Sequence, residues 1–167
     1  MHQVFWTGIA LLLLTPLPGV AQVTPEFRVR AMISATDDIR NEVASCINRE
    51  LRSLGDVTLV DENPTNELQL VAMSVHNRGG TTTGVVFAAA VLQPMRAYVE
   101  VFRQSFAPSE EQNAMLDYLA WSVTVEDLWL RTGSDDQIRE LCEELVADYD
   151  VEHLEPIRAA LREGSKP

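Results

Sequence analysis

A strand–helix–strand pattern over residues 27–61 constrains the fold of this chain more than any other feature. Residues 27–34 begin with alternating apolar and polar side chains, which predicts a strand with one buried face. Apolar residues then recur at three- and four-residue spacing, namely Ile39, Val43, Cys46, Ile47, Leu51 and Leu54. This spacing predicts an amphipathic helix that Thr36-Asp37-Asp38 caps and Gly55 ends. A short strand over residues 57–61 would complete a right-handed parallel crossover.

The middle of the chain predicts an antiparallel meander. Residues 68–76, 83–92 and 98–106 are interpreted as three strands, separated by a turn at residues 77–80 and by Gln93-Pro94. The run from Val85 to Leu92 contains no polar residue, so this strand is expected at the centre of the sheet or covered on both faces.

Two capping-box patterns predict helices in the last third of the chain. Ser109 to Gln112 precedes one helix, after which residues 121–125 alternate like a strand. Ser134 to Gln137 opens another, whose apolar face is formed by Ile138, Leu141, Cys142, Leu145, Val146 and Tyr149. A short final helix is expected to bury Leu154, Ile157 and Leu161. Residues 22–167 are therefore predicted to form a single α+β domain. Its mixed sheet would have about five to six strands, with a βαβ start, an antiparallel meander and two main helices on one face.

Residues 1–21 have the pattern of a cleavable signal peptide, with cleavage expected near Ala21. The alternative is a membrane anchor, but the apolar run is shorter than the roughly 20 residues that span a bilayer. The mature chain is therefore expected in the periplasm or outside the cell, with no transmembrane segment. Its formal net charge of −12 lies mostly in residues 107–167 and disfavours nucleic acids and anionic lipid headgroups as partners.

Cys46 and Cys142 are the only cysteines, and each falls on the apolar face of a predicted helix. In an exported protein such a pair predicts a disulfide. The alternative is two buried thiols, which are common in protein cores. Without a Cys-x-x-Cys motif, redox catalysis has little support.

The histidines offer weak candidates for chemistry. His153 lies among four acidic residues, Asp148, Asp150, Glu152 and Glu155. These could form a cation site, but without a fixed loop spacing a solvated acidic helix face is favoured. His76 is expected at a strand end with its ring toward solvent. No nucleophile motif accompanies either histidine, so no catalytic residue, metal or cofactor is predicted.

Two further groups are candidate binding residues. The loop at residues 77–84 is rich in glycine but lacks the lysine and following helix of a phosphate-binding loop, which favours a hairpin tip. If it binds a ligand, Arg78, Thr81 and Thr82 would supply the hydrogen bonds. Trp121 and Trp129 are expected in the core, or alternatively on an exposed shelf for a sugar or peptide.

The first half of the chain resembles a known family of envelope domains. The resemblance rests on the helix end Leu51-Arg52-Ser53-Leu54-Gly55, the strand Val57 to Asp61 and the strand start Leu68 to Val71. It is similar in arrangement to the N-terminal α/β domain of the periplasmic protein TolB and to CsgG-like domains. Residues 130–133 and 141–150 look like those of bacterial exported proteins of unassigned function. The resemblance implies an envelope protein that binds other proteins, and it assigns no catalytic residue.

The leading functional hypothesis is a noncatalytic protein-binding or assembly module of the cell envelope, with envelope proteins as partners. The alternative is a small periplasmic ligand-binding protein or hydrolase acting on an envelope-derived substrate. Its site would use acids near Trp121 and Trp129, or the loop at Arg78.

Overall fold

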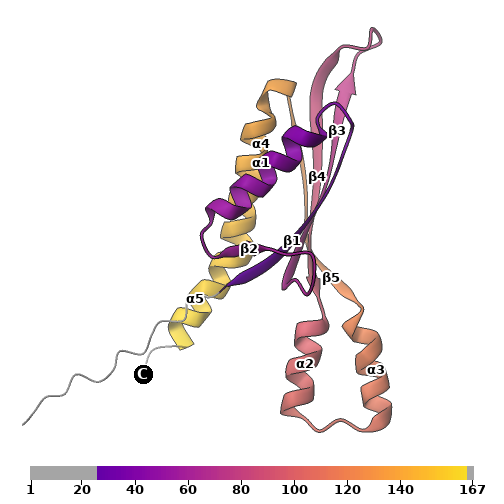
Figure 1. Cartoon of the computed structure of the whole chain (residues 1–167), viewed down its shortest axis with the longest axis vertical. Coiled ribbons are helices and arrows are strands. Elements are labelled where there is room, and N and C mark those ends of the chain that lie inside the picture. The colour runs from indigo at the N-terminus through magenta and orange to yellow at the C-terminus, as the bar shows by residue number, and fades with distance from the viewer. Residues whose placement is uncertain (1–25, 165–167) are drawn as a thin grey trace, which may run out of the picture.

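The computed structural model describes residues 26–164 and shows one α+β domain built on a mixed five-stranded sheet (Figure 1). The strands are β1 (Phe27–Ala35), β2 (Val57–Leu59), β3 (Asn66–His76), β4 (Thr82–Pro94) and β5 (Val123–Gly133). Their order in the sheet is β2-β1-β3-β4-β5. β1 runs parallel to β2 and β3, whereas β3, β4 and β5 pair antiparallel. The predicted fold class is confirmed.

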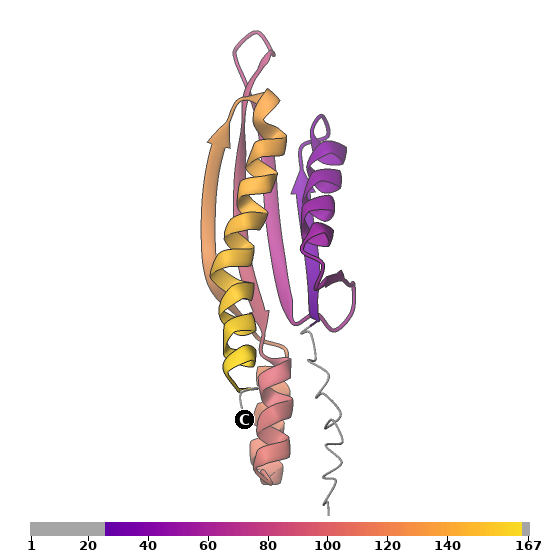
Figure 2. The same cartoon turned by 90° about the vertical axis from the view of Figure 1, so that its left-hand side faces the viewer.

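Two helices cover one face of the sheet. They are α1 (Arg40–Ser53) and α4 (Ile138–Tyr149), which lie side by side in front of the strands in Figure 2. Their predicted apolar faces are buried, and Val43, Ile47 and Tyr149 are completely inaccessible to solvent. These side chains pack on alternate residues of the central strands, including Leu70 of β3 and Phe87 of β4. The prediction of two main helices on one face is correct.

The predicted cap of α1 at Thr36-Asp37-Asp38 is wrong, because Ile39 is the N-cap residue of that helix and no side chain caps it. The other predicted helix ends are present. Ser109 and Ser134 each form a capping box with the glutamine three residues later. Gly55 follows the last residues of α1 with a φ of 78°, a left-handed conformation that glycine adopts without steric cost.

A two-helix arm replaces the strand that was predicted over residues 98–106. The arm consists of α2 (Arg96–Ser105) and α3 (Glu110–Ala120), inserted between β4 and β5. It projects past the end of the sheet in both views (Figures 1 and 2). The strand prediction is wrong because apolar residues here also recur at helical spacing: Phe102 stacks near Phe106, with ring centroids 4.8 Å apart. Arg103 joins the two helices through hydrogen bonds to the Asn113 carbonyl and the Asp117 carboxylate.

The predicted signal peptide lies outside the described residues. Among the helices within residues 26–164, none is long and apolar enough to cross a membrane.

A largely buried ion pair attaches the C-terminal helix to the rest of the domain. A π-helical segment, η2 (Asp150–Leu154), joins α4 to α5 (Glu155–Gly164). From α5, Arg158 donates to both carboxylate oxygens of Asp56, at 2.6 and 2.8 Å, and its guanidinium lies 5.4 Å from the Phe27 ring centre. Its Nη1 also lies 2.7 Å from Asp150. The hydrogen bonds from Arg158 hold the pKa of Asp56 below its ordinary value.

We expect Arg158→Met to lower the free energy of unfolding by about 3 kcal/mol, because it leaves the largely buried Asp56 carboxylate without its partner. Arg162→Met is the matched control, since Arg162 is exposed and its pair with Glu155 contributes about 1 kcal/mol or less. Urea unfolding would measure both changes. Equal losses of unfolding free energy in the two variants would contradict the role of the Arg158–Asp56 ion pair.

The same pair predicts a dependence of stability on pH. Because the folded-state pKa of Asp56 is lowered, the contribution of the Asp56 carboxylate to the free energy of unfolding is complete above the unfolded-state pKa of about 3.9. The contribution is lost as the pH falls through the lower, folded-state value. The difference in stability between the wild type and Arg158→Met should therefore shrink below about pH 4.

Candidate functional site

No element within residues 26–164 covers the face of the sheet opposite α1 and α4 (Figure 1), and this face is apolar across much of β3, β4 and β5. Strand register places Val71, Ala88 and Leu130 in one row across β3, β4 and β5. Leu128 and Leu130 are 72% and 71% exposed. The exposed apolar side chains of β3 and β5 on this face are Val71, Met73, Val75, Val125, Leu128 and Leu130. We call this set the open face; a contiguous apolar surface of this kind is typical of a binding site.

The helical arm carries a second exposed apolar surface. Its exposed large side chains are Tyr98, Phe102, Phe106, Met115, Tyr118 and, at the end of α3, Trp121. Trp121 is 89% exposed, and no residue of α3 is buried. Aromatic side chains of this kind are enriched where proteins bind one another. The sequence analysis missed this surface because it interpreted α2 as a strand of the sheet.

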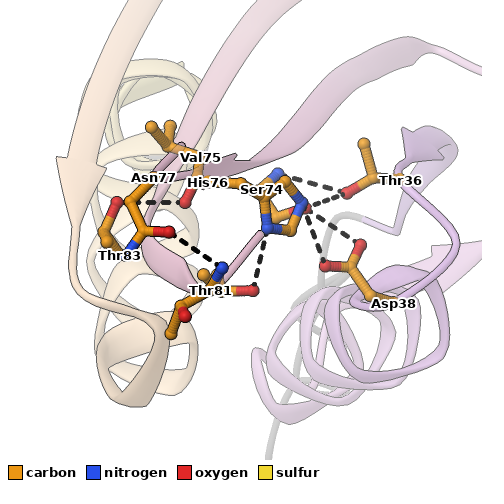
Figure 3. A network of polar contacts seen from close by, with 9 residues as sticks. Thr36, Asp38, Ser74, Val75, His76, Asn77, Thr81 and Thr83 are labelled. Carbon is orange, nitrogen blue, oxygen red and sulfur yellow. Dashed lines mark hydrogen bonds and ion pairs between the residues drawn. The ribbon is translucent and has the colours of Figure 1, made fainter. Parts of the chain in front are cut away.

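A serine, a histidine and an aspartate meet where β1, β3 and β4 come together (Figure 3). Ser74 Oγ lies 3.0 Å from Asp38 Oδ1 and 3.1 Å from His76 Nε2. Thr36 Oγ1 also lies 3.0 Å from Ser74 Oγ. The hydrogen bonds of Ser74 and Thr36 lower the pKa of Asp38. Sequence reasoning missed this group because its members are far apart along the chain.

This group lacks the order of a catalytic triad. A carboxylate only accepts hydrogen bonds, so the Ser74 hydroxyl donates its proton to Asp38 and not to His76. His76 Nδ1 lies 3.2 Å from the Thr82 hydroxyl, where a triad would place the carboxylate. The network therefore joins the β1–α1 turn to the β3–β4 hairpin, and the arrangement does not activate Ser74 as a nucleophile.

The loop residues predicted as candidates lie at the tip of the β3–β4 hairpin. The Asn77 side chain accepts hydrogen bonds from the backbone N–H groups of Gly79 and Thr81, at 2.9 and 3.0 Å. Figure 3 shows Asn77 beside Thr81 in this loop. These donors are therefore already used within the loop and are not directed at a ligand. Arg78 and Thr81 are exposed, and Thr82 contacts His76. A binding role for these three residues stays a prediction.

The two tryptophans occupy different parts of the molecule. Trp121 lies at the end of the arm helix α3, whereas Trp129 lies on β5 and packs against the core. The Trp129 ring meets the His153 ring edge-on, with centroids 5.5 Å apart. Trp129 therefore packs in the core as expected, whereas Trp121 does not. A role for either tryptophan in binding a sugar or peptide stays a prediction.

The acidic residues around His153 differ from those that the sequence suggested. Asp148 pairs with Arg131, and Asp150 and Glu155 pair with Arg158. Of the four predicted acids, only Glu152 joins His153 in a cluster with metal-ligand spacing, and the third member is Asp127 of β5. Glu126 lies beside the same imidazole.

Cys46 of α1 and Cys142 of α4 are buried, free thiols. The disulfide that the sequence predicted is therefore not present in the structure. The two helices that carry these thiols lie side by side, but no S–S bond of about 2.05 Å joins the two sulfurs. Burial, with the hydrogen bond to Cys46, holds the pKa of Cys142 well above its ordinary value.

We expect both thiols to resist iodoacetamide in the native protein at neutral pH and to react fully after unfolding without reductant. Burial keeps the reagent away, and the raised pKa of Cys142 removes the thiolate that would attack it. Mass spectrometry of the alkylated chain would count the modified residues. A requirement for reductant before the unfolded chain reacts would show a disulfide instead.

Comparison with known proteins assigns the chain to no family. No family model matches the sequence, and no curated protein matches it significantly. A PelC dodecamer from Paraburkholderia phytofirmans is 15% identical over 81% of this chain and 92% of that chain, with a TM-score of 0.41. A DUF330-family protein from Xanthomonas campestris is 12% identical, covering 79% and 87% of the two chains, with a TM-score of 0.44.

Rare lipoprotein B from Shewanella oneidensis is 12% identical over 80% of this chain and 98% of that chain, with a TM-score of 0.32. All three TM-scores are below 0.5. The resemblance to TolB and CsgG-like domains stays a prediction.

Proposed function

We propose that this chain is an exported, noncatalytic assembly module whose copies associate head to tail, with the arm of one copy on the open face of the next. The observation that carries this proposal is the presence of two exposed apolar surfaces of different shape on one chain, a sheet face and a pair of helices. The expected signal peptide supports export to the cell envelope.

Layer packing supports a helical occupant for the open face. A sheet with apolar side chains on both faces is stable when each face is covered by another layer. Here α1 and α4 cover one face, while Val71, Leu128 and Leu130 on the other remain exposed. The arm helices form a second helical layer, and they do not pack on the sheet of their own copy.

The geometry of the arm favours a second copy over its own sheet. The arm continues in the long direction of the sheet and points away from it in both views (Figures 1 and 2). It is also fixed at both ends by strands, because β4 ends at Pro94 and β5 begins at Val123. An arm held in this way can reach the open face of a neighbouring molecule, which makes the contact heterologous.

The acidic residues of α4 and η2 do not oppose this contact. Near the β1 end of the open face, Arg30 pairs with Glu67, and Arg28 adds a further positive charge. The acidic residues of α4 and η2 lie on the helical side of the sheet or beside it. Two copies in head-to-tail contact would therefore keep these acids away from the interface, where unpaired charge is costly.

Two acidic substitutions test the proposal separately on each surface. We expect Leu130→Glu on the open face and Tyr118→Glu on the arm each to weaken self-association at least tenfold, because either carboxylate would be buried without a partner. Val151→Glu, an equally apolar and exposed position on η2, is the matched control and should associate like the wild type. Sedimentation velocity over a range of concentrations would measure the oligomeric state.

Mixing the two variants distinguishes head-to-tail contact from other arrangements. The Leu130→Glu chain keeps a normal arm and the Tyr118→Glu chain keeps a normal open face, so the mixture should form a heterodimer with one intact interface. A wild type that stays monomeric would contradict self-assembly. Variants that stay monomeric when mixed would contradict the head-to-tail contact.

A further inference from the structure

We propose that His153, Asp127 and Glu152 bind a divalent first-row transition-metal ion, with Zn²⁺ as the natural probe, between β5 and η2. One ligand atom from each of these residues lies within 4.8 Å of the other two. The cluster lies beside the core and apart from the open face and the arm, so this inference does not depend on the proposed assembly.

Two irregularities of the backbone bring the groups together. The pairing of β4 with β5 shifts register between Val91 and Leu92, whose partners are Asp127 and Val125, so Glu126 is an extra residue in β5. This bulge allows the consecutive residues Glu126 and Asp127 both to reach the same imidazole. His153 and Glu152 belong to the π-helical segment η2, a form that is rare and often found at functional sites.

The imidazole of His153 is largely buried and held in place. Its side chain is 10% exposed and packs against the rings of Trp129 and Tyr149, at centroid distances of 5.5 and 5.7 Å. Within residues 26–164, its Nε2 atom has no hydrogen-bond partner. A buried polar atom without a partner is uncommon and calls for an explanation such as a bound ion.

The surroundings of the ring match those of a metal-binding histidine. Nε2 faces Asp127 Oδ2 at 3.9 Å, close to the separation of about 3 to 4 Å between two ligand atoms on one zinc ion. On the opposite side, Nδ1 lies 3.4 Å from Glu126 Oε2. A ligating histidine commonly directs its second ring nitrogen at a carboxylate, which fixes the tautomer and orients the ring. Glu126 is thus a positioning residue, and Nε2 is the ligand atom.

The donor set indicates the class of ion. Mg²⁺ and Ca²⁺ bind through oxygen ligands, whereas one imidazole nitrogen with carboxylates suits zinc and its neighbours in the first transition row. Three protein ligands leave at least one position for water. An ion here would join β5 through Asp127 to η2 through Glu152 and His153, and would strengthen the attachment of the C-terminal helix.

Isothermal titration calorimetry of the untagged protein with ZnCl₂, in excess Mg²⁺ to occupy diffuse carboxylate sites, tests the proposal. We expect one Zn²⁺ per chain. Asp127→Asn and Glu152→Gln should each weaken binding at least tenfold, and Glu126→Gln should also weaken it, by roughly tenfold. Glu143→Gln on α4 is the matched control, because it removes the same charge from an exposed acid outside the cluster.

The outcomes separate a built site from a general attraction of cations to an acidic chain. Equal affinity in the wild type and Glu152→Gln, or no binding in the wild type, would overturn the proposal. An equal loss in Glu143→Gln would also overturn it, because binding would then follow net charge. In a nitrogen-15 NMR spectrum of the histidine rings, Zn²⁺ should shift Nε2 of His153 and leave His76 unchanged. A shift of the His76 ring nitrogens alone would contradict the assignment of His153 as the metal ligand.

Discussion

The packing of α1 and α4 on one face of the sheet is the constraint on which the rest of the structure depends. Val43 and Ile47 of α1 and Leu145 and Tyr149 of α4 are buried over the central strands and make one continuous core. Burying side chains of this size stabilises the fold by about 1.5 to 3 kcal/mol each, before the entropy cost of ordering them. Because both long helices lie on the same side, the second face of the sheet has no cover within residues 26–164.

The polar groups of the domain serve mainly to join its elements. Arg158 fastens α5 to Asp56 after α1, and Arg131 of β5 pairs with Glu144 and Asp148 of α4. Ser74, His76 and Asp38 connect a turn to a hairpin. Each charged or hydroxyl group in these contacts is occupied by a structural partner. The His153 cluster differs, since a buried ring nitrogen faces carboxylates there without a hydrogen bond from the described residues.

Hydrophobic spacing predicted the elements that build the core and failed where no core forms. The spacing of Ile39 to Leu54, and that of Ile138 to Tyr149, predicted α1 and α4 because those helices bury one face. Residues 98–106 were assigned to a strand because aromatic and β-branched residues favour strands, although their apolar residues also recur at the helical spacing that α2 adopts. The apolar run from Val85 to Leu92 predicted a strand inside the sheet, and β4 lies between β3 and β5.

The sequence signal for the open face was present, but its meaning depended on topology. An apolar run in β4 indicates that both faces of the strand are to be shielded from water. Only the structure shows that elements of the described chain pack on one of these faces and leave the other exposed. The position of Glu126 and Asp127 beside His153 could not be predicted in the same way. Regular alternation would send Glu126 and Asp127 to opposite faces, and the bulge that unites them has no clear sequence signature. The exposed arm and the open face together support the proposal that the arm of one copy covers the open face of the next.

Intermolecular photo-crosslinking tests this claim most directly. A benzophenone amino acid at position 118 of the arm would be activated in a mixture of nitrogen-14 and nitrogen-15 labelled protein, and the crosslinked peptides would be identified by mass spectrometry. The account predicts crosslinks of mixed isotope from the arm to peptides of β3 and β5 that contain Met73, Leu128 or Leu130. Crosslinks confined to single-isotope peptides, or crosslinks from the arm only to another arm, would contradict it.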